Sequence, residues 1–474
     1  MHWVDIVIFV IYMIVMLGVG AFFLRKNKNH EDYYVGGRSM NSFHVGLSVV
    51  ATDVGGGFSI GLGGLGFAIG LSGSWLLFTG LLGAWISAVI LVPKIYKLGK
   101  LKNLLTFPQV FKHFYGKEVA FAAGIISAIG YIGFTSSQLL AGAKLFSSTF
   151  ESIHMDTALI IMGLIAVIYT VMGGLKAVIY TDTIQWIILM AGLFLIGIPV
   201  AYYSLGGYEA IVNSVPEPFL TLTNTNWQTI VKWMVTVIPI WFVGMTLYQR
   251  IFASKDEKSA KKAWFIAGLF EYPIMAFMGV ILGLFARVAF ENNMFAEFGF
   301  PVGSAIDHEL GLPLLLRKVI PVGLMGLIMS AFFSAIMSTA DSCLMAASGN
   351  IMTDIFPNKR KKELPLFISQ LITLLIGIIA ITLAWFMEDV LELMLYSYSF
   401  MVSGLFIPIL GALFWKRSHP TGALIAMIMG GLTTVLLTII KAPLPLQLDP
   451  NVFGITVSAV FFFSFSLMLK SKSV

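Results

Sequence analysis

Residues 51 to 57 read Ala51-Thr52-Asp53-Val54-Gly55-Gly56-Gly57, which places a carboxylate and three successive glycines in the middle of an apolar run from about 43 to 69. Glycine disfavours a helix, and an unpaired charge inside a bilayer costs about 3 kcal/mol or more. The combination indicates an unwound segment that lines a cavity, where free backbone carbonyls can coordinate a cation. The alternative is that the glycines only permit close helix packing and that Asp53 is a paired structural acid.

The whole chain has the composition of a membrane protein. Of its 474 residues, 58% are hydrophobic and only 11% are charged, which lies outside the usual range of soluble proteins. A bilayer core roughly 30 Å thick needs about 20 apolar residues per spanning helix, and such stretches follow one another almost from end to end. We therefore expect a multi-pass protein of the plasma (inner) membrane, with the lipid bilayer around it.

Several other classes of protein are poor matches to this sequence. The net charge of +6 arises from small basic clusters between apolar runs, so we expect no nucleic-acid partner. Cys343 is the only cysteine, which excludes an internal disulfide, and no Cys/His cluster has the spacing of metal ligands. The seven histidines stand near span ends or in loops, with no nucleophile or metal partner in the pattern. We therefore do not expect an enzyme, and nothing in the pattern implies an obligate protein partner.

The apolar pattern predicts an all-α protein with about thirteen transmembrane helices. The first span is too long for the core of a signal peptide and lacks a small-residue cleavage site, so we expect it to remain in the membrane. The thirteen spans are approximately residues 3–24, 43–69, 74–96, 118–147, 157–174, 177–203, 228–248, 264–290, 318–345, 364–387, 389–414, 421–441 and 449–470.

The basic residues predict the orientation of these spans. If the N-terminus lies outside, the outer loops hold few basic residues, chiefly Arg317 and Lys318. The positive-inside rule therefore predicts the N-terminus outside and the C-terminus inside. The basic residues expected on the cytoplasmic side are Arg25, Lys26, Lys28, Lys94, Lys97, Lys100, Lys102, Arg250, Lys255, Lys258, Lys261, Lys262, Lys359, Arg360, Lys361, Lys362, Lys416, Arg417, Lys470 and Lys472.

The ninth span carries a second polar pattern. Five of its polar residues recur at helical spacing and share one face: Ser330, Ser334, Ser338, Asp341 and Ser342, with Thr339 beside them. Hydroxyl and carbonyl oxygens are hard ligands that suit a sodium ion. Serines also serve ordinary packing between membrane helices, but the acid at the end of the stripe favours ion binding.

Four local patterns, in this order, resemble those of the sodium:solute symporter family, and the resemblance covers nearly the whole chain. The most specific is the segment from Tyr169 to Gln185, which contains Gly173-Gly174 and Thr181-Asp182-Thr183. The other three are Tyr34-Val35-Gly36-Gly37-Arg38-Ser39-Met40, the run from Ala51 to Gly57, and Met337-Ser338-Thr339-Ala340-Asp341-Ser342 followed by Thr353-Asp354.

The resemblance implies the leucine-transporter type of fold, with discontinuous helices and two inverted five-helix repeats in a single transporter domain of residues 1–474. The repeats would be residues 43–203 and 228–414. Residues 1–42 would form an extra first helix with a cytoplasmic loop, and residues 415–474 two C-terminal helices. In such folds the substrate lies near the midplane beside the broken helices, and two bundles rock to expose it alternately.

The resemblance also implies a set of sodium ligands. The principal site would use the backbone carbonyls of Ala51, Val54 and Ala335 with the hydroxyls of Ser338 and Thr339. Some members bind a second sodium ion closer to the cytoplasm, and that pattern falls on Asp182, Ser338, Asp341 and Ser342, where Asp341 replaces a hydroxyl. An alternative role for Asp182 is that of an acid in the first turn of a helix, so one or two ions per cycle remain possible.

The substrate is predicted only by class. Residues expected to line the cavity are Asp53, Gln138, Trp241, Tyr248, Tyr396, Ser397 and Tyr398. Aromatic residues at helical spacing are more often packing residues. If Asp53 faces the cavity, its charge favours a small solute with an amine or quaternary ammonium group, such as an amino acid or a choline-like compound, and the aromatic rings add cation–π attraction.

Two alternatives to a sodium-coupled symporter remain open. A proton-coupled carrier of a monocarboxylate or sugar would have the same spans. A solute sensor derived from a transporter would normally carry an added signalling domain, and only a few residues follow the last predicted span. Uptake into proteoliposomes with an imposed sodium or proton gradient distinguishes these functions.

Overall fold

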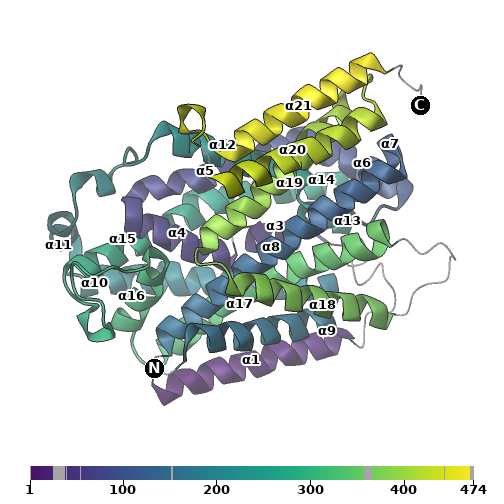
Figure 1. Ribbon diagram of the computed structural model, residues 1–474. Helices are drawn as coiled ribbons and strands as arrows, with labels where there is room; N and C mark the ends of the chain where they lie inside the picture. Colours follow the sequence, from purple (N-terminus) through teal and green to yellow (C-terminus); the bar gives the residue numbers. More distant parts are fainter. Residues whose placement is uncertain are drawn as a thin grey trace.

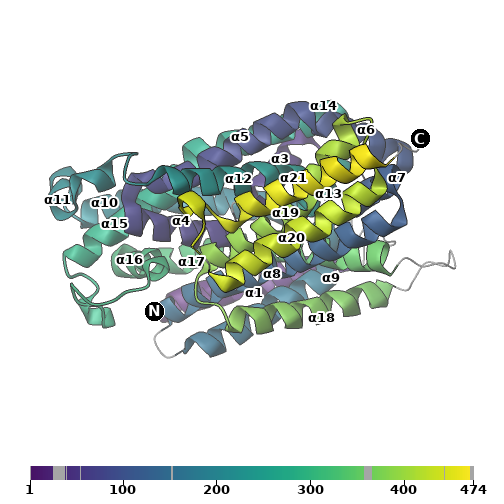
Figure 2. The same ribbon diagram turned by 45° about the horizontal axis from the view of Figure 1, so that its top comes forward.

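The computed structural model describes residues 2–24, 38, 40–53, 55–150, 153–356, 366–441 and 443–469. Long helices lie side by side in one bundle, and α1 (Trp3–Leu24) begins at the end of the bundle opposite to the one where α21 (Pro450–Met468) stops (Figure 1). The view in Figure 2 shows the same arrangement. Within the described residues there are helices and no β-strand, with one isolated bridge between Met40 and Ser254. The all-helical prediction is confirmed.

Most predicted spans lie at or near a helix. Besides α1 and α21, these are α5 (Trp75–Ile90), α8 (Lys117–Thr149), α17 (Leu324–Asn350), α18 (Leu366–Trp385), α19 (Val390–Phe414) and α20 (Pro420–Ile440). Shorter helices connect them: α6 (Val92–Lys102), α7 (Pro108–Tyr115), α11 (Gly207–Ser214) and α16 (Gly311–Val319). Apolar runs of about 20 residues are long enough to span a bilayer, which explains why hydropathy locates these helices well.

The second predicted span is broken where the sequence indicated. Helix α3 (Ser42–Asp53) ends at the acid, and α4 (Gly56–Ile69) begins within the glycine run. Val54, between them, lies outside the described residues, as does most of the predicted motif from Tyr34 to Met40. The predicted unwound segment is therefore confirmed as a helix break.

The seventh predicted span is also broken, which its sequence did not indicate to us. In place of one helix at 228–248, the chain forms α12 (Trp227–Val243) and α13 (Met245–Ala253), bent by 41° at Gly244. The break follows Pro239, which cannot donate a helical hydrogen bond. A second helix break therefore lies in the half of the chain opposite to the first.

The fifth and sixth predicted spans are parts of one helical segment. Helix α9 (Met155–Met190) continues through a π-helical turn, η3 (Ala191–Gly197), into α10 (Ile198–Ser204). Thr170 and Asp182 of α9 both bond to one short stretch of α17, at Asp341 and Ser338. A straight helix would separate residues twelve apart by about 18 Å. Helix α9 therefore bends between them.

The eighth predicted span contains a π-helical turn. Helix α14 (Glu257–Phe270) continues through η5 (Glu271–Ala276) into α15 (Phe277–Glu291). Asp256 caps α14, because its side chain accepts a hydrogen bond from the Ser259 backbone N–H at 2.6 Å. This hydrogen bond holds the pKa of Asp256 below its usual value.

Nine helical stretches of the described residues are long and apolar enough to cross a membrane, or ten if α12 and α13 form one span. Two shorter apolar stretches, Trp3–Gly18 and Met155–Val171, lie in α1 and α9. The structure thus contains many apolar helices, as expected, while the count of thirteen and the orientation stay predictions.

The halves of the two broken helices pack in matching ways. Helix α4 packs along α15, and α12 packs along α5. Helices α4 and α15 are in close contact. A Cβ added at Gly66 would lie only 2.2 Å from the carbonyl oxygen of Val280, and a Cβ added at Gly283 would lie 2.0 Å from the carbonyl oxygen of Gly63. Gly63, Gly66 and Gly283 therefore permit the close packing of α4 on α15. Helices α8 and α17 pack against each other in the interior.

Candidate functional site

The first helix break meets α17 at Thr339. The Thr339 hydroxyl donates to the backbone carbonyl of Ala51 at 2.8 Å and lies 3.2 Å from that of Ala335. All three residues are buried. Three of the predicted sodium ligands therefore converge on one point, although Ala51 lies more than 280 positions before Ala335 and Thr339 in the chain.

Gly55 is required at this point because there is no space for a side chain. An added Cβ would lie 1.6 Å from the Thr339 Oγ1 atom and 3.1 Å from the Ala51 carbonyl oxygen. The glycine lets the backbone of the break approach the hydroxyl of α17 directly. Carbonyl and hydroxyl oxygens in contact are the donor set that a sodium ion requires, so these residues fit the predicted ion.

Ser338 points toward a different neighbour. Its hydroxyl donates to one oxygen of Asp182, whose other oxygen accepts from the Ser48 hydroxyl at 2.5 Å. Both Ser338 and Asp182 are buried. The structure thus brings Ser338 together with Asp182, one of the residues predicted for the second ion. Asp182 lies well inside α9, so its predicted alternative as a first-turn acid is wrong.

Arg250, which we counted among the basic residues of the cytoplasmic side, occupies the centre of this second group. It lies on α13 and is fully buried. Its NH2 atom donates to Thr52 at 2.6 Å and to Ser342 at 2.7 Å, and it lies 3.6 Å from Asp182. The side chain is buried because α13 extends beyond the predicted span end and turns it into the protein.

Asp341 is bonded only in part. One of its oxygens accepts a hydrogen bond from Thr170, and the other has no hydrogen-bond partner among the described residues. Ser330 donates to the carbonyl of Gly326 in its own helix at 2.7 Å. Ser334 donates to Ser330 at 2.6 Å and is also hydrogen-bonded to the Tyr12 hydroxyl of α1. The other members of the stripe therefore contact other helices, whereas Ser330 fits the packing alternative.

Two of the predicted substrate residues come together at the break. Asp53, with 6% of its surface exposed, ends α3, and the Tyr398 hydroxyl of α19 donates to its Oδ1 atom at 3.3 Å. The other carboxylate oxygen of Asp53 has no hydrogen-bond partner among the described residues. Trp241 is also fully buried, and its ring meets that of Trp264 edge to face, with centroids 6.3 Å apart.

The remaining predicted substrate residues have local partners. The Tyr248 hydroxyl donates to the Phe242 carbonyl at 2.8 Å, across the second break. Ser397 donates to the carbonyl of Leu393 at 2.8 Å, within its own helix. Buried Gln138 donates to Ser137 at 3.3 Å, and partly exposed Tyr396 donates to Glu392. These side chains do not converge on Asp53 as the Tyr398 hydroxyl does.

Three residues that sequence reasoning missed lie at these sites: Arg250, Glu271 and Tyr131. Glu271 lies inside the predicted eighth span, and an acid within an apolar span is itself a signal of function. Tyr131 of α8 places its hydroxyl at the second break, where it accepts from the Thr246 backbone N–H at 3.1 Å. No spacing in the sequence could have indicated that contact.

A charged network holds the ends of several helices together at one end of the bundle. Lys144 of α8 contacts Asp307 at 2.6 Å and Glu309 at 2.7 Å. The Glu309 carboxylate also accepts from the backbone N–H groups of Val390 and Leu391, each at 3.0 Å, at the start of α19. The network holds α8 and α19 together at one end of the bundle.

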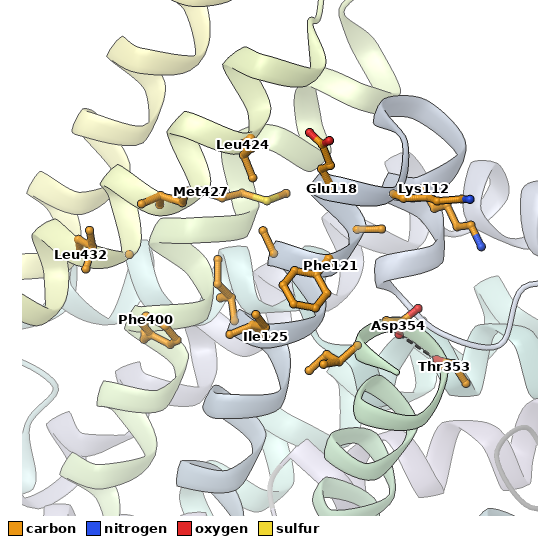
Figure 3. Close-up of a pocket in the computed structure, with 17 residues that line it drawn as sticks. Lys112, Glu118, Phe121, Ile125, Thr353, Asp354, Phe400, Leu424, Met427 and Leu432 are labelled. Carbon is orange, nitrogen blue, oxygen red and sulfur yellow. Dashed lines mark hydrogen bonds between the residues drawn. The ribbon is translucent and has the colours of Figure 1, made fainter. Parts of the chain in front are cut away.

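A cavity of about 980 Å³ lies apart from the broken helices, between α8, α20 and the end of α17 (Figure 3). Apolar side chains such as Phe121 and Met427 line much of it, and Lys112 and Glu118 stand at one side. Asp354, from the predicted Thr353-Asp354 pattern, accepts a hydrogen bond from Thr106 at 3.0 Å beside this cavity. None of the predicted ion or substrate residues lines it.

Comparison with known proteins connects this geometry to transporters. The model of the "Sodium:solute symporter family" matches residues 33–430. The high-affinity proline transporter PutP of Bacillus subtilis (strain 168) is 29% identical over 438 residues, which cover 89% of each chain. The sodium/glucose cotransporter 1 of Ovis aries is 27% identical over 482 residues, which cover 91% of this chain and 71% of its own.

A solved structure shares the fold. The structure of a Na+-coupled sialic acid symporter, in a substrate-bound outward-open state, has a TM-score of 0.83 with this chain. The two are 20% identical in sequence, and the match covers 99% of each chain. A likeness at this level of identity supports the fold alone.

Proposed function

Because the chain belongs to the sodium:solute symporter family, we propose that it is a sodium-coupled symporter that imports a small organic solute across the plasma membrane by alternating access. The observation that carries this proposal is the meeting of the first break with α17, where the carbonyls of Ala51 and Ala335 lie within 3.2 Å of the Thr339 hydroxyl. Several oxygen acceptors at a helix break suit a cation. Sodium binding there would tie α3 to α17, which are the elements that must separate when the site opens.

We propose one coupled sodium ion, held by Ala51, Ala335 and Thr339, with Val54 as a further ligand. Arg250 supplies a positive charge 3.6 Å from Asp182 and also contacts Ser342. A guanidinium in this position takes the place that a second cation would occupy. Asp341, which keeps one unpartnered oxygen, stays the proposed ligand for a cation or proton in this region.

The proposed substrate is a small solute that carries an amine, such as an amino acid or a choline-like compound. Support comes from Asp53, a buried carboxylate at the break with one unpartnered oxygen, and from the proline transporters among the relatives. Sugar cotransporters are also among the relatives, so sugars belong in any substrate screen. Tyr398 is the aromatic residue best placed to contribute, because its hydroxyl donates to Asp53 at 3.3 Å.

We propose thirteen spans with the N-terminus outside and the C-terminus inside. An odd number of crossings agrees with α1 starting and α21 stopping at opposite ends of the bundle (Figure 1). The inverted repeats of residues 43–203 and 228–414 are part of this proposal. They are supported by the matched packing of the two broken helices, each of which contacts a hydroxyl from one of the paired helices α8 and α17.

Uptake into proteoliposomes tests the proposed coupling. Purified protein is reconstituted, and uptake of radiolabelled solutes is measured with an inward sodium gradient, an inward potassium gradient or a pH gradient. We expect accumulation with sodium alone. Uptake that survives replacement of sodium by potassium, but responds to the pH gradient, would support a proton-coupled carrier instead.

A further inference from the structure

A second buried acid faces Asp53 from the other half of the chain. Glu271 opens the π-helical turn η5 and is fully buried. Its carboxyl group is close enough to that of Asp53 for direct interaction. Both oxygens of Glu271 and the Oδ2 atom of Asp53 have no hydrogen-bond partner among the described residues. Apart from the contact between the two carboxyl groups themselves, these three oxygens have no donor among the described residues.

Helix α5 leaves a space for this acid. A Cβ at Gly80 would lie 2.7 Å from Oε2 of Glu271 and 2.9 Å from its Oε1 atom. Gly83, one turn further along the same face of α5, lies against Trp241, whose Cδ1 atom would be 2.3 Å from an added Cβ. The indole N–H of Trp241, adjacent to Cδ1, is buried and has no hydrogen-bond partner among the described residues. Within the described residues, a second buried polar group without a hydrogen-bond partner therefore lies about one turn of α5 away from Glu271.

The charges around the pair do not balance. Like charges in a low-dielectric interior repel, and a buried carboxylate without a cation is costly. Arg250, the buried cation of α13, is engaged by Asp182, Thr52 and Ser342. Lys144 is engaged by Asp307 and Glu309 near the end of α8. A proton shared between the two carboxyl groups relieves their repulsion when no ligand is bound, and a bound cationic group can take the place of that proton.

We infer that Asp53 and Glu271 form one subsite that binds the amine of the transported solute, and that this amine carries at least two N–H groups. The inference rests on the proposed symport function and narrows its substrate class. An ionised carboxylate only accepts hydrogen bonds, so a primary or secondary ammonium supplies the missing donors. A quaternary ammonium group has no N–H and leaves all three oxygens without a donor. The Trp241 N–H then suits an acceptor elsewhere on the same solute.

Matched amines test this subsite on the purified protein. Binding is measured by thermal shift in sodium and in potassium buffer, with L-proline against N,N-dimethylproline and ethanolamine against choline. Glucose and sialic acid serve as neutral and anionic probes. We expect an N–H amine to bind about tenfold or more tightly than its permethylated form, the size of effect expected when hydrogen bonds to charged groups are lost.

Two substitutions assign the effect to the pair. Glu271→Gln keeps the shape of the side chain and removes its charge, and we expect it to weaken binding of the N–H amine by about tenfold or more. The shift caused by sodium alone should remain. Glu392→Gln, which removes a solvent-exposed acid of α19, is the matched control and should bind like the unaltered protein.

Each other outcome contradicts the inference in a distinct way. Equal binding of parent and permethylated amines overturns the N–H requirement. Unchanged amine binding in Glu271→Gln overturns the paired subsite, and so does a sodium-dependent response to glucose or sialic acid with none to any amine. If sodium causes no thermal shift in the unaltered protein, that result contradicts the proposed sodium coupling instead. Amine binding is then measured in potassium buffer.

Discussion

The two broken helices of this protein differ in what occupies the break. At the second break, between α12 and α13, each backbone group named above has a partner from the protein: Gly244 N–H bonds to Ile240, Thr246 N–H bonds to Tyr131, and the Phe242 carbonyl accepts from Tyr248. At the first break, between α3 and α4, acceptors outnumber donors. The carbonyls of Ala51 and Ala335 share the hydroxyl of Thr339, and one oxygen of Asp53 has no hydrogen-bond partner among the described residues.

This difference separates a hinge from a binding site. A break whose donors and acceptors are paired within the protein is stable without a ligand. A break with surplus acceptors, next to buried acids, is stabilised by cations from outside. Arg250 connects the two, because it lies on α13 and bonds to Ser48 and Thr52 of α3. Substitutions at matched positions of the two breaks therefore test the assignment.

The largest effect is expected from adding a methyl group at each break. In Gly55→Ala the new Cβ would lie 1.6 Å from Thr339 Oγ1, so α3, α4 or α17 must move apart. We expect sodium-driven uptake to fall to background. In Gly244→Ala the nearest atoms are 3.1 Å away, at the Ile240 oxygen and a Leu247 methyl, which small shifts can relieve. This variant should retain uptake in proteoliposomes.

If both glycine variants lose uptake equally, the two breaks are equally intolerant of an added methyl group, and the proposed difference between them is wrong. Expression and elution as a single species should be checked for both proteins. Retention of uptake in Gly55→Ala would remove the first break from the ion pathway.

An intermediate effect is expected from the ion pair between Asp182 of α9 and Arg250 of the second broken helix. Asp182→Asn leaves Arg250 buried without its counter-charge, which costs about 3–5 kcal/mol when one partner of a buried ion pair is removed. We expect a clear fall in Tm. The double variant Asp182→Asn, Arg250→Gln removes both charges and should recover part of the loss.

The same variants test the number of ions. If Arg250 takes the place of a second sodium ion, the Hill coefficient for sodium stays near that of the unaltered protein in Asp182→Asn. A change in the coefficient, with no recovery of Tm in the double variant, would favour a second ion bound by Asp182.

The smallest effect is expected from single hydroxyl groups. Thr339→Val removes one oxygen from the first break, and we expect sodium affinity to fall about tenfold, which corresponds to roughly 1.4 kcal/mol. Tyr131→Phe removes the partner of the Thr246 N–H at the second break, which should cost about 1 kcal/mol of stability without changing sodium affinity. Sodium titrations by thermal shift measure both quantities.

Weaker sodium binding in Tyr131→Phe than in Thr339→Val would reverse the roles of the two breaks. Thr339→Ser, which keeps the hydroxyl, is the control for the loss of the methyl group and should bind sodium like the unaltered protein.

The approximate positions of most helices were predictable from the sequence, because apolar runs of about 20 residues locate membrane helices by hydropathy alone. The first break was also predictable: an acid and three glycines in an apolar run conflict with a continuous helix. The second break was not, since Pro239 and Gly244 occur in a segment that is otherwise apolar and long enough to span. Isolated glycines and prolines are common in membrane helices, and only the contacts of their neighbours reveal a break.

The candidate site, like the two breaks, was predictable from the sequence only in part. The sequence by itself determined which residue types are available for an ion: oxygen donors at 51–57 and at 335–342, each confined to one helix face or one break. Only the tertiary structure decided which of them meet, placing Thr339 at Ala51, Ser338 at Asp182, Arg250 among them and Glu271 beside Asp53. The physical reason is that helical periodicity sets contacts over a few residues, whereas these pairs are joined by the packing of helices far apart in the chain.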